Sequence, residues 1–192
     1  MIVYIDNKGL VMTKRFALDM DGPCSKFIHG ALRALDRTEL LDNYPPGATN
    51  LSEITGIPYP EMYAKIDAVG SDFWKNLEET STFWELYNGL SELGEVCFLT
   101  SPSLDSNSLK GKAEWLQDRF GKRFRNYAIS YPKWHWASPD VILIDDTKEQ
   151  CDKFIANGGL AVQYPTRLNG LHDVCAEEHR AKYVLEKVKE LL

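Results

Sequence analysis

The sequence predicts an α/β fold in which a mostly parallel sheet is covered by helices on both faces. Short apolar runs, typical of buried strands, alternate along the chain with segments that have the apolar spacing of helices. Four of the apolar runs are followed by polar side chains. Because the carboxyl ends of parallel strands meet at one edge of a sheet, where such sheets bind ligands, we expect these side chains to form one site.

The composition is that of a globular protein of ordinary domain size. The chain has 192 residues, of which 44% are hydrophobic and 26% are charged. Its net charge of −6 argues against binding of long nucleic acids, which rests on clustered Lys and Arg. A small anionic substrate is compatible with this charge, and the sequence leaves open whether the chain forms a homodimer.

The cysteines and histidines show no pattern of a disulfide framework or a zinc site. The Cys residues are scattered without a C-x-x-C pair, and the His residues lack a metal-binding spacing. The N-terminal segment is too short and too charged for a signal peptide or a membrane span. We therefore expect a soluble cytoplasmic protein with reduced thiols and no membrane contact.

Two short apolar runs at the N-terminus, residues 2–5 and 10–12, predict a hairpin. Asp6 follows the first run, as a catalytic aspartate would, but it lacks a second acid two positions later. Its Asn-Lys-Gly context is typical of a hairpin turn, so we interpret Asp6 as a turn residue.

The segment 16–23 carries the motif around which the other motifs are arranged. Residues 16–18 predict the end of a buried strand, and Asp19 and Asp21 follow before a Gly-Pro breaker. An extended backbone places both carboxylates on the same side, where they repel unless a cation or a shared proton lies between them. Mg²⁺ suits such oxygen ligands. The structural alternative is a polar strand end with a turn, and partners elsewhere must decide between the two.

Between this motif and the next strand, the sequence predicts helices separated by a long loop. Residues 25–41 have helical spacing with Ser25 as the N-cap, and residues 42–60 are rich in Pro, Gly, Asn and Ser. Residues 61–79 and 81–93 are again helical in character. A loop of that length inside a small domain is usually functional or part of an insertion.

The second half of the chain repeats the design of a strand followed by polar groups. Three predicted strands have this form: residues 95–99 before Thr100 and Ser101, residues 127–130 before Lys133, and residues 139–144 before Asp145 and Asp146. The other predicted elements are helices at 106–120, 147–157 and 175–192, a strand at 160–164, and loops at 134–136 and 165–173. The polar groups together offer a carboxylate nucleophile, a second carboxylate for proton transfer, donors for an oxyanion, and acids for a metal.

These motifs, in this order, resemble those of the haloacid dehalogenase superfamily of phosphatases. They stand here as LDMDG, FLTSP, Lys133 and ILIDD, and the match spans residues 16 to about 154. Within the superfamily the sequence is most similar to the 5′(3′)-deoxyribonucleotidases, because DMDGP, FLTSP, the KAEWLQDRFG helix, ISYPK and VILIDDT follow that family's order. The spacing departs in one place, since Lys133 and Asp145 stand farther apart than in that family.

The resemblance implies a Rossmannoid three-layer sandwich with a small helical cap inserted after the first motif. Residues 1–25 and 94–192 would form the core, and residues 26–93 the cap. The implied activity is Mg²⁺-dependent hydrolysis of nucleoside monophosphates, above all deoxyribonucleoside monophosphates. The expected partner is therefore a small nucleotide substrate.

The resemblance also implies a role for each site residue. Asp19 would be the nucleophile that forms an aspartyl-phosphate, and Asp21 would protonate the leaving alcohol and later activate water. Phosphate would be bound by Thr100, Ser101 and Lys133. Mg²⁺ would be bound by Asp19, by Asp21 through its backbone carbonyl, and by one or both of Asp145 and Asp146, with Asp146 as the expected direct ligand. Phe27, Phe73 and Trp74 would lie near the nucleobase.

The sequence is compatible with several alternative functions. The chain could act on another small phosphomonoester or on a nucleic-acid 3′-phosphate end, or it could be an inactive phosphate-binding regulatory module. A receiver domain also combines acids, a hydroxyl residue and a lysine around Mg²⁺. Receivers place the acid pair first and the phosphoacceptor later, which is the reverse of the order here.

Overall fold

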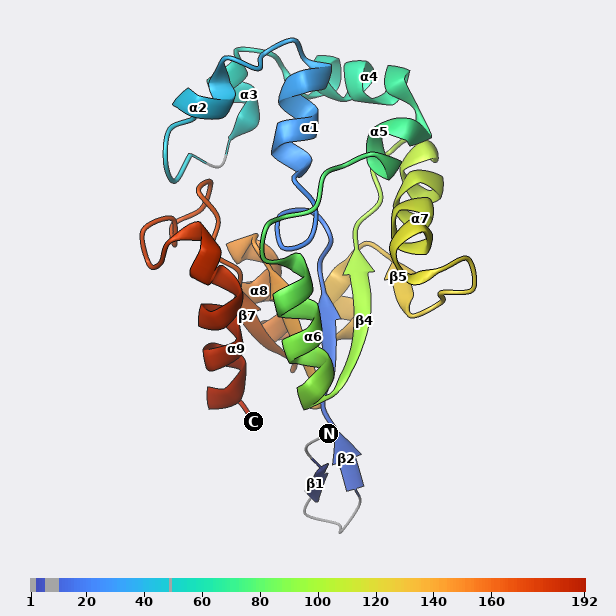
Figure 1. Cartoon of the computed structure of the whole chain (residues 1–192), viewed down its shortest axis with the longest axis vertical. Coiled ribbons are helices and arrows are strands. Elements are labelled where there is room, and N and C mark those ends of the chain that lie inside the picture. Colours follow the sequence, from blue (N-terminus) through green and yellow to red (C-terminus); the bar gives the residue numbers. More distant parts are fainter. Residues whose placement is uncertain (1–2, 6–10, 49) are drawn as a thin grey trace.

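The structure is a computed structural model that describes residues 3–5, 11–48 and 50–192. Its centre is a five-stranded, entirely parallel sheet with the strand order β5-β4-β3-β6-β7 (Figure 1). The strands are β3 (Arg15–Leu18), β4 (Glu95–Thr100), β5 (Tyr127–Ile129), β6 (Val141–Asp145) and β7 (Leu160–Gln163). The predicted α/β class with a mostly parallel sheet is confirmed.

The strand β3 lies in the middle of the sheet and leads into the first acidic motif. Leu18 pairs with Phe98 of β4 on one side and with Ile144 of β6 on the other. This register brings the carboxyl ends of the three strands to a similar level, so the polar groups that follow them can meet.

A separate antiparallel hairpin precedes the sheet. β1 (Val3–Ile5) pairs with β2 (Val11–Thr13), which agrees with the hairpin predicted from the two N-terminal apolar runs. Figure 1 shows the hairpin beyond the end of the sheet that is opposite the carboxyl ends of the strands. Asp6 and its predicted turn lie outside the described residues.

Helices cover both faces of the sheet and complete three layers. One face carries α6 (Phe83–Leu93), α7 (Asn107–Phe120) and α9 (Arg180–Glu190), and the other carries α8 (Lys148–Ala156) and the 3₁₀ helix η1 (Lys133–Trp136). A second 3₁₀ helix, η2 (Glu177–His179), precedes α9. Side chains alternate along β3, so Phe16 and Leu18 join the first core and Ala17 the second. Among the described residues, no helix is both long and apolar enough to cross a membrane.

A further group of helices lies beyond the carboxyl ends of the strands (Figure 1). It comprises α1 (Phe27–Ala34), α2 (Leu40–Asn43), α3 (Leu51–Thr55), α4 (Tyr59–Val69) and α5 (Ser71–Lys75). We call this helical layer, residues 27–75, the cap. The helix α6 falls within the range 26–93 that the sequence predicts for the cap, but it packs on β4 and α9 of the sheet layers.

The two connections of the cap to the sheet layers run antiparallel to each other. Ser25 lies opposite Glu79 in an isolated bridge, and the backbone N–H of Lys26 donates to the carbonyl oxygen of Glu78 at 2.8 Å. The cap therefore begins and ends at adjacent points.

The cap helices differ from the predicted ones where local backbone chemistry interrupts the apolar pattern. The predicted helix 25–41 stops at Ala34, and Asp36 then takes a positive φ of 56°. The predicted helix 61–79 is divided at Gly70, whose φ is 75°. Helical periodicity alone therefore overestimates the length of these helices.

The predicted loop 42–60 contains a short helix, α3. Its N-cap is Asn50, whose side-chain oxygen accepts bonds from the backbone N–H groups of Ser52 and Glu53 at 3.1 and 3.2 Å. The capping signal is weak in the sequence because many Pro and Gly residues surround it.

The cap helix α5 packs closely on α7 through Gly111. A Cβ atom at this position would lie 2.3 Å from the backbone oxygen of Ser71 and 2.6 Å from Cβ of Trp74. The close approach of the two helices therefore requires glycine at position 111.

We expect Gly111→Ala to lower the free energy of unfolding by about 1–3 kcal/mol, because the added methyl group would push α5 away from α7. Helix propensity acts in the opposite direction, since Ala is favoured over Gly by about 1 kcal/mol in a helix interior. Urea unfolding measures the difference, and Lys110→Ala at the exposed neighbouring position is the control. A stabilised Gly111→Ala protein would contradict the packing account.

Candidate active site

The predicted site residues lie at the carboxyl edge of the sheet. Asp19 and Asp21 follow β3, Thr100 ends β4, and Asp145 ends β6. One cavity of about 1070 Å³ is lined by Asp19, Asp21, Thr100, Ser101, Lys133 and Asp146, and Asp145 lies fully buried behind it. The four motifs therefore converge at one place.

A buried lysine connects two of the acids. Lys133 is 3% exposed, and its Nζ lies 2.7 Å from Oδ1 of Asp19 and 2.6 Å from Oδ2 of Asp145. Burial alone would lower the pKa of Lys133, but the two carboxylates outweigh it and raise the pKa, so the side chain is a cation. The longer spacing between Lys133 and Asp145 is taken up by η1 and the turn before β6, and the two side chains still meet.

Asp19 is buried, and only one of its carboxylate oxygens is engaged. Oδ1 accepts bonds from Lys133 and from the backbone N–H of Met20 at 2.8 Å. Within the described part of the chain, Oδ2 has no hydrogen-bond partner. Burial raises the pKa of Asp19 to about 7, with Lys133 opposing the shift and Asp145 and Asp21 adding to it.

Asp19, Asp145 and Asp146 form a group that fits a divalent cation. One carboxylate oxygen from each lies within 4.8 Å of the other two. Burial, followed by the charges of Asp145 and Asp19, raises the pKa of Asp146 well above its usual value. Three carboxylates around a single lysine leave negative charge unbalanced, and a set of oxygen ligands without His or Cys suits Mg²⁺.

The two acids of the closing pair have different surroundings. The oxygens of Asp145 accept bonds from Lys133 and from the backbone N–H of Thr147 at 2.8 Å. Asp146 accepts a long bond of 3.4 Å from the Thr147 hydroxyl, and its Oδ2 faces Gly22, where a Cβ atom would lie 2.3 Å away. Asp146 is thus the acid with oxygens available to a cation, while Asp145 fixes Lys133.

A second buried lysine, which is not among the predicted site residues, holds Asp21. Lys112 of α7 is 2% exposed, and its Nζ lies 2.6 Å from Oδ2 of Asp21. The same ammonium donates to Oγ1 of Thr100 at 2.8 Å and to the backbone oxygen of Ser101 at 2.7 Å. Lys112 therefore connects the first acidic motif with the Thr-Ser motif.

A signal for Lys112 is present in the sequence. Lys112 shares the helical phase of Trp115 and Leu116, which are both buried on the inner face of α7. A lysine at a core position is almost never fully buried unless it is paired. The position of Lys112 within the helical pattern, rather than its residue type, is thus the informative feature.

Ser25 orients Asp21 and does not cap α1 as predicted. Its hydroxyl donates to Oδ1 of Asp21 at 2.9 Å. The N-cap position of α1 is occupied by Lys26, which makes no capping bond through its side chain. Both carboxylate oxygens of Asp21 are thus held, one by Ser25 and one by Lys112.

The cavity extends from the acids to the cap. Of the aromatic residues predicted near the substrate, Phe27 and Trp74 line it, and Phe73 is not among the lining residues. Phe27 stacks on Trp74 with ring centres 5.5 Å apart, and Phe73 meets both rings edge-on. Trp74 and Phe73 are buried, whereas Phe27 is partly exposed, so Phe27 offers the accessible ring.

The loop after β7 connects the acidic group with the cap. The side chain of Asn169 donates to the backbone oxygen of Asp146 at 2.9 Å. The Arg167 guanidinium donates to the carbonyl oxygen of Asp42 at 3.1 Å. The backbone carbonyl oxygen of Arg167 accepts a hydrogen bond from the backbone N–H of Gly47 at 2.8 Å. This loop therefore forms a wall of the cavity between the sheet edge and the cap.

No model of a known protein family matches the chain, and no curated protein matches it. Several solved structures are similar. A haloacid dehalogenase-like hydrolase from Xanthomonas campestris is 14% identical, with 93% of this chain and 91% of that chain covered and a TM-score of 0.54. A haloacid dehalogenase-like family hydrolase from Streptococcus pneumoniae is 17% identical, with 93% and 97% covered and a TM-score of 0.54. A candidate β-phosphoglucomutase from Bacteroides vulgatus is 14% identical, with 94% and 89% covered and a TM-score of 0.51. The chain has the fold of these proteins, as the motifs predict.

We expect the chain to bind Mg²⁺, and Asp146→Asn to weaken binding by at least about tenfold, because the substitution removes an anionic ligand. Isothermal titration calorimetry measures both dissociation constants. Asp152→Asn is the control, since Asp152 is an exposed acid of α8 that does not line the cavity. Equal affinities of the wild-type and Asp146→Asn proteins would rule out Asp146 as a ligand.

Proposed function

We propose that this chain hydrolyses phosphomonoesters through an aspartyl-phosphate on Asp19, and that its substrates are nucleoside monophosphates, above all deoxyribonucleoside monophosphates. The observation that carries the proposal is the environment of Asp19. This residue is buried, lies 2.7 Å from Lys133, and stands two positions before Asp21 at the carboxyl edge of a parallel sheet. The similarity in fold to known hydrolases supports the same chemistry.

In the first step, Oδ2 of Asp19 attacks the phosphorus atom of the substrate. A bond forms between these two atoms, and the bond from phosphorus to the leaving alcohol oxygen breaks. Asp21, with a proton on Oδ1 while Lys112 still binds Oδ2, gives that proton to the oxygen of the leaving alcohol. The hydroxyls of Thr100 and Ser101 and the ammonium of Lys133 would donate to the phosphoryl oxygens as charge develops on them.

In the second step, a water molecule attacks the phosphorus atom of the aspartyl-phosphate. Asp21 is now a carboxylate and takes a proton from the water. The bond from phosphorus to Asp19 breaks, inorganic phosphate is released, and both acids return to their starting states. Lys112 holds Oδ2 of Asp21 in both steps, and Ser25 contacts Oδ1, the oxygen that would give and take the proton.

The side chains of Asp19 and Asp146, with the backbone carbonyl of Asp21, would hold Mg²⁺. The charge of the ion would balance the substrate phosphate and the acidic group. Asp145 would contribute indirectly, because it fixes the ammonium of Lys133 at 2.6 Å.

The side chains that the cap contributes to the cavity favour a substrate whose alcohol part contains a ring that can stack. Its contribution to the cavity includes the partly exposed Phe27 together with Met62, Tyr59 and Tyr63. A base stacked on an aromatic side chain is worth about 1–3 kcal/mol. The cavity volume of about 1070 Å³ is ample for a nucleotide.

Two alternative functions would use the same site. In the first, the same acids would hydrolyse another small phosphomonoester or a nucleic-acid 3′-phosphate end, without a base stacked in the cap. In the second, the chain would be a regulatory module that binds phosphate without turnover. The net charge of −6 weighs against long nucleic acids. Phosphate release from a panel of nucleoside monophosphates and an aryl phosphate, with and without Mg²⁺, separates these functions.

We expect Asp19→Asn to abolish nearly all phosphate release from nucleoside monophosphates, with kcat reduced by at least about 10³-fold, because an amide cannot replace the carboxylate nucleophile. A melting temperature near that of the wild-type protein shows that the variant is folded. If the variant keeps more than about a tenth of the activity, a difference of only about 1.4 kcal/mol, Asp19 is not the nucleophile.

We expect a nucleoside monophosphate to have a much higher kcat/KM than a phosphate ester without a base. Phe27→Ala should reduce this advantage by about 1–3 kcal/mol in transition-state free energy and spare the small ester. Phe73→Ala is the matched control, because Phe73 packs behind the cavity and should affect both substrates alike. Equal loss on both substrates in Phe27→Ala, with a large drop in melting temperature, would show that Phe27 only packs the cap.

A further inference from the structure

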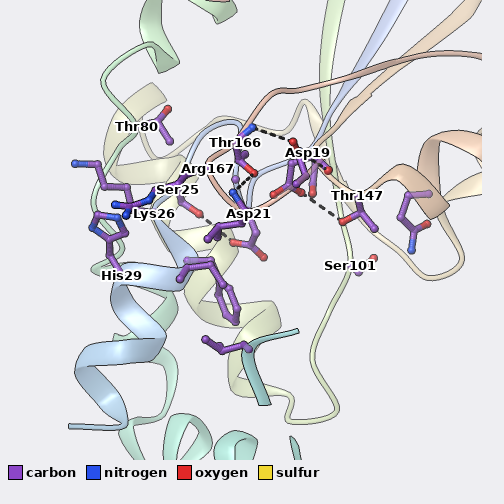
Figure 2. A pocket seen from close by; sticks show the side chains of 18 of the residues that line it. Asp19, Asp21, Ser25, Lys26, His29, Thr80, Ser101, Thr147, Thr166 and Arg167 are labelled. Atoms are coloured by element: carbon purple, nitrogen blue, oxygen red, sulfur yellow. Dashed lines mark hydrogen bonds between the residues drawn. The ribbon is translucent and has the colours of Figure 1, made fainter. Parts of the chain in front are cut away.

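The cavity contains a second group of positive side chains, apart from the two lysines that hold the acids. Lys26, Arg167 and Arg180 line the same cavity as Asp19, and we call these three residues the cationic wall. Figure 2 shows Lys26 and Arg167, with His29, on one side of the pocket and Asp19 on the other. Lys26 comes from the connection to the cap, Arg167 from the loop after β7, and Arg180 from the start of α9.

Among the residues that the structure describes, the acidic partners of Lys26 and Arg180 are distant. The Nζ of Lys26 lies 3.7 Å from Glu78, whose carboxylate already accepts a bond of 2.5 Å from Arg33. A guanidinium nitrogen of Arg180 lies 3.6 Å from Glu177. The lysines that hold the acids, by contrast, have carboxylates at 2.6 to 2.7 Å. The charges of Lys26 and Arg180 are thus only loosely paired.

Arg167 has no carboxylate within 4.0 Å among the residues that the structure describes. One nitrogen of its guanidinium donates to the carbonyl oxygen of Asp42, which leaves its other donors available to a ligand. A guanidinium presents these donors in a planar fork that matches phosphate and carboxylate oxygens. Arg167 is therefore well suited to receive an anion from the cavity.

The first turn of α1 adds positive potential beside the wall. Its N-cap position has no side-chain bond, and no acidic residue stands in the turn. Figure 1 shows α1 extending from the sheet edge into the cap, and residues 26–29 at its N-terminal end line the cavity. Unpaired N–H groups and the helix dipole favour an anion at such an end. Burial, together with Lys26 and Arg33, lowers the pKa of His29 in this turn, while Glu78 and Glu177 oppose the shift.

We propose that the cationic wall binds a second anionic group of the substrate. The preferred substrate is then a phosphomonoester whose alcohol part carries a further phosphate or a carboxylate. For a nucleoside, this class is the nucleoside 3′,5′-bisphosphate. The inference rests on the proposed function, because it assumes that the phosphate to be cleaved lies at Asp19. Cations that line a cavity without a close carboxylate raise its local positive potential, and a second anionic group on the substrate would pair with them.

The test compares kcat/KM within two pairs of substrates, with products separated by chromatography. The first pair is thymidine 3′,5′-bisphosphate and thymidine 5′-monophosphate, and the second is phosphoglycolate and ethyl phosphate. We expect at least about a tenfold advantage for the member with the second anion in one pair, and that pair identifies whether a phosphate on a nucleoside or a carboxylate is recognised.

The ratio of the kcat/KM values within that pair should fall toward one in Arg167→Gln and in Lys26→Gln. Arg167→Lys should retain part of the preference. Lys65→Gln is the matched control, since Lys65 is an exposed cation of the cap that does not line the cavity. Melting temperatures verify that each variant is folded. Equal kcat/KM values within both pairs, or an advantage that Arg167→Gln and Lys26→Gln leave unchanged, would overturn the inference and leave the proposed function intact.

Binding to the Asp19→Asn protein keeps the two proposals distinguishable. Calorimetry on this variant compares the dissociation constants of the bisphosphate and the monophosphate without turnover. Tighter binding of the bisphosphate, lost when Arg167→Gln is added, supports the cationic wall even if the wild-type chain hydrolyses no ester, in which case only the proposed function fails. Equal dissociation constants would overturn the inference independently of activity.

Discussion

The site depends on the balance of buried charge at the carboxyl edge of the sheet. Lys133 lies between Asp19 and Asp145 at 2.7 and 2.6 Å, and all three side chains are nearly or fully buried. An unpaired charge in such a place is strongly unfavourable, so each group is fixed where the others compensate it. A single lysine cannot balance Asp146 as well. The remaining negative charge explains why the edge of the sheet is suited to a cation.

A continuous set of contacts joins the cap to the acid Asp21. Phe27 stacks on Trp74, the ammonium of Lys112 lies 4.8 Å from the centre of the Trp74 ring, and Lys112 holds Asp21 at 2.6 Å. Gly111 permits the close packing of α5 on α7 on which this arrangement depends. The helices α5 and α7 thus shape the side of the cavity that would meet the substrate, and α7 also orients Asp21, the acid that would transfer protons.

The sheet and its acids are predictable from the sequence because a strand that ends in polar groups leaves a local pattern, and parallel topology brings such ends together. The cap is less predictable, since two of its helices stop shortly before Asp36 and Gly70, where the backbone takes a positive φ. The burial of Lys112 cannot be predicted from its residue type, because lysines on a polar helix usually face solvent. The different environments of Asp145 and Asp146 arise from tertiary contacts that no sequence pattern records.

The adjacent entry and exit of the cap, where Ser25 lies opposite Glu79, have a consequence for the evolution of this fold. A segment that leaves and re-enters at neighbouring points can be exchanged, shortened or extended without displacing the strands. The acids belong to the sheet layers, whereas Phe27, Tyr59 and Tyr63 belong to the exchangeable segment. Under the proposed function, the acids of the reaction and the rings that would stack on a base therefore lie in separable parts of the chain, and selection could alter the second while it preserves the first.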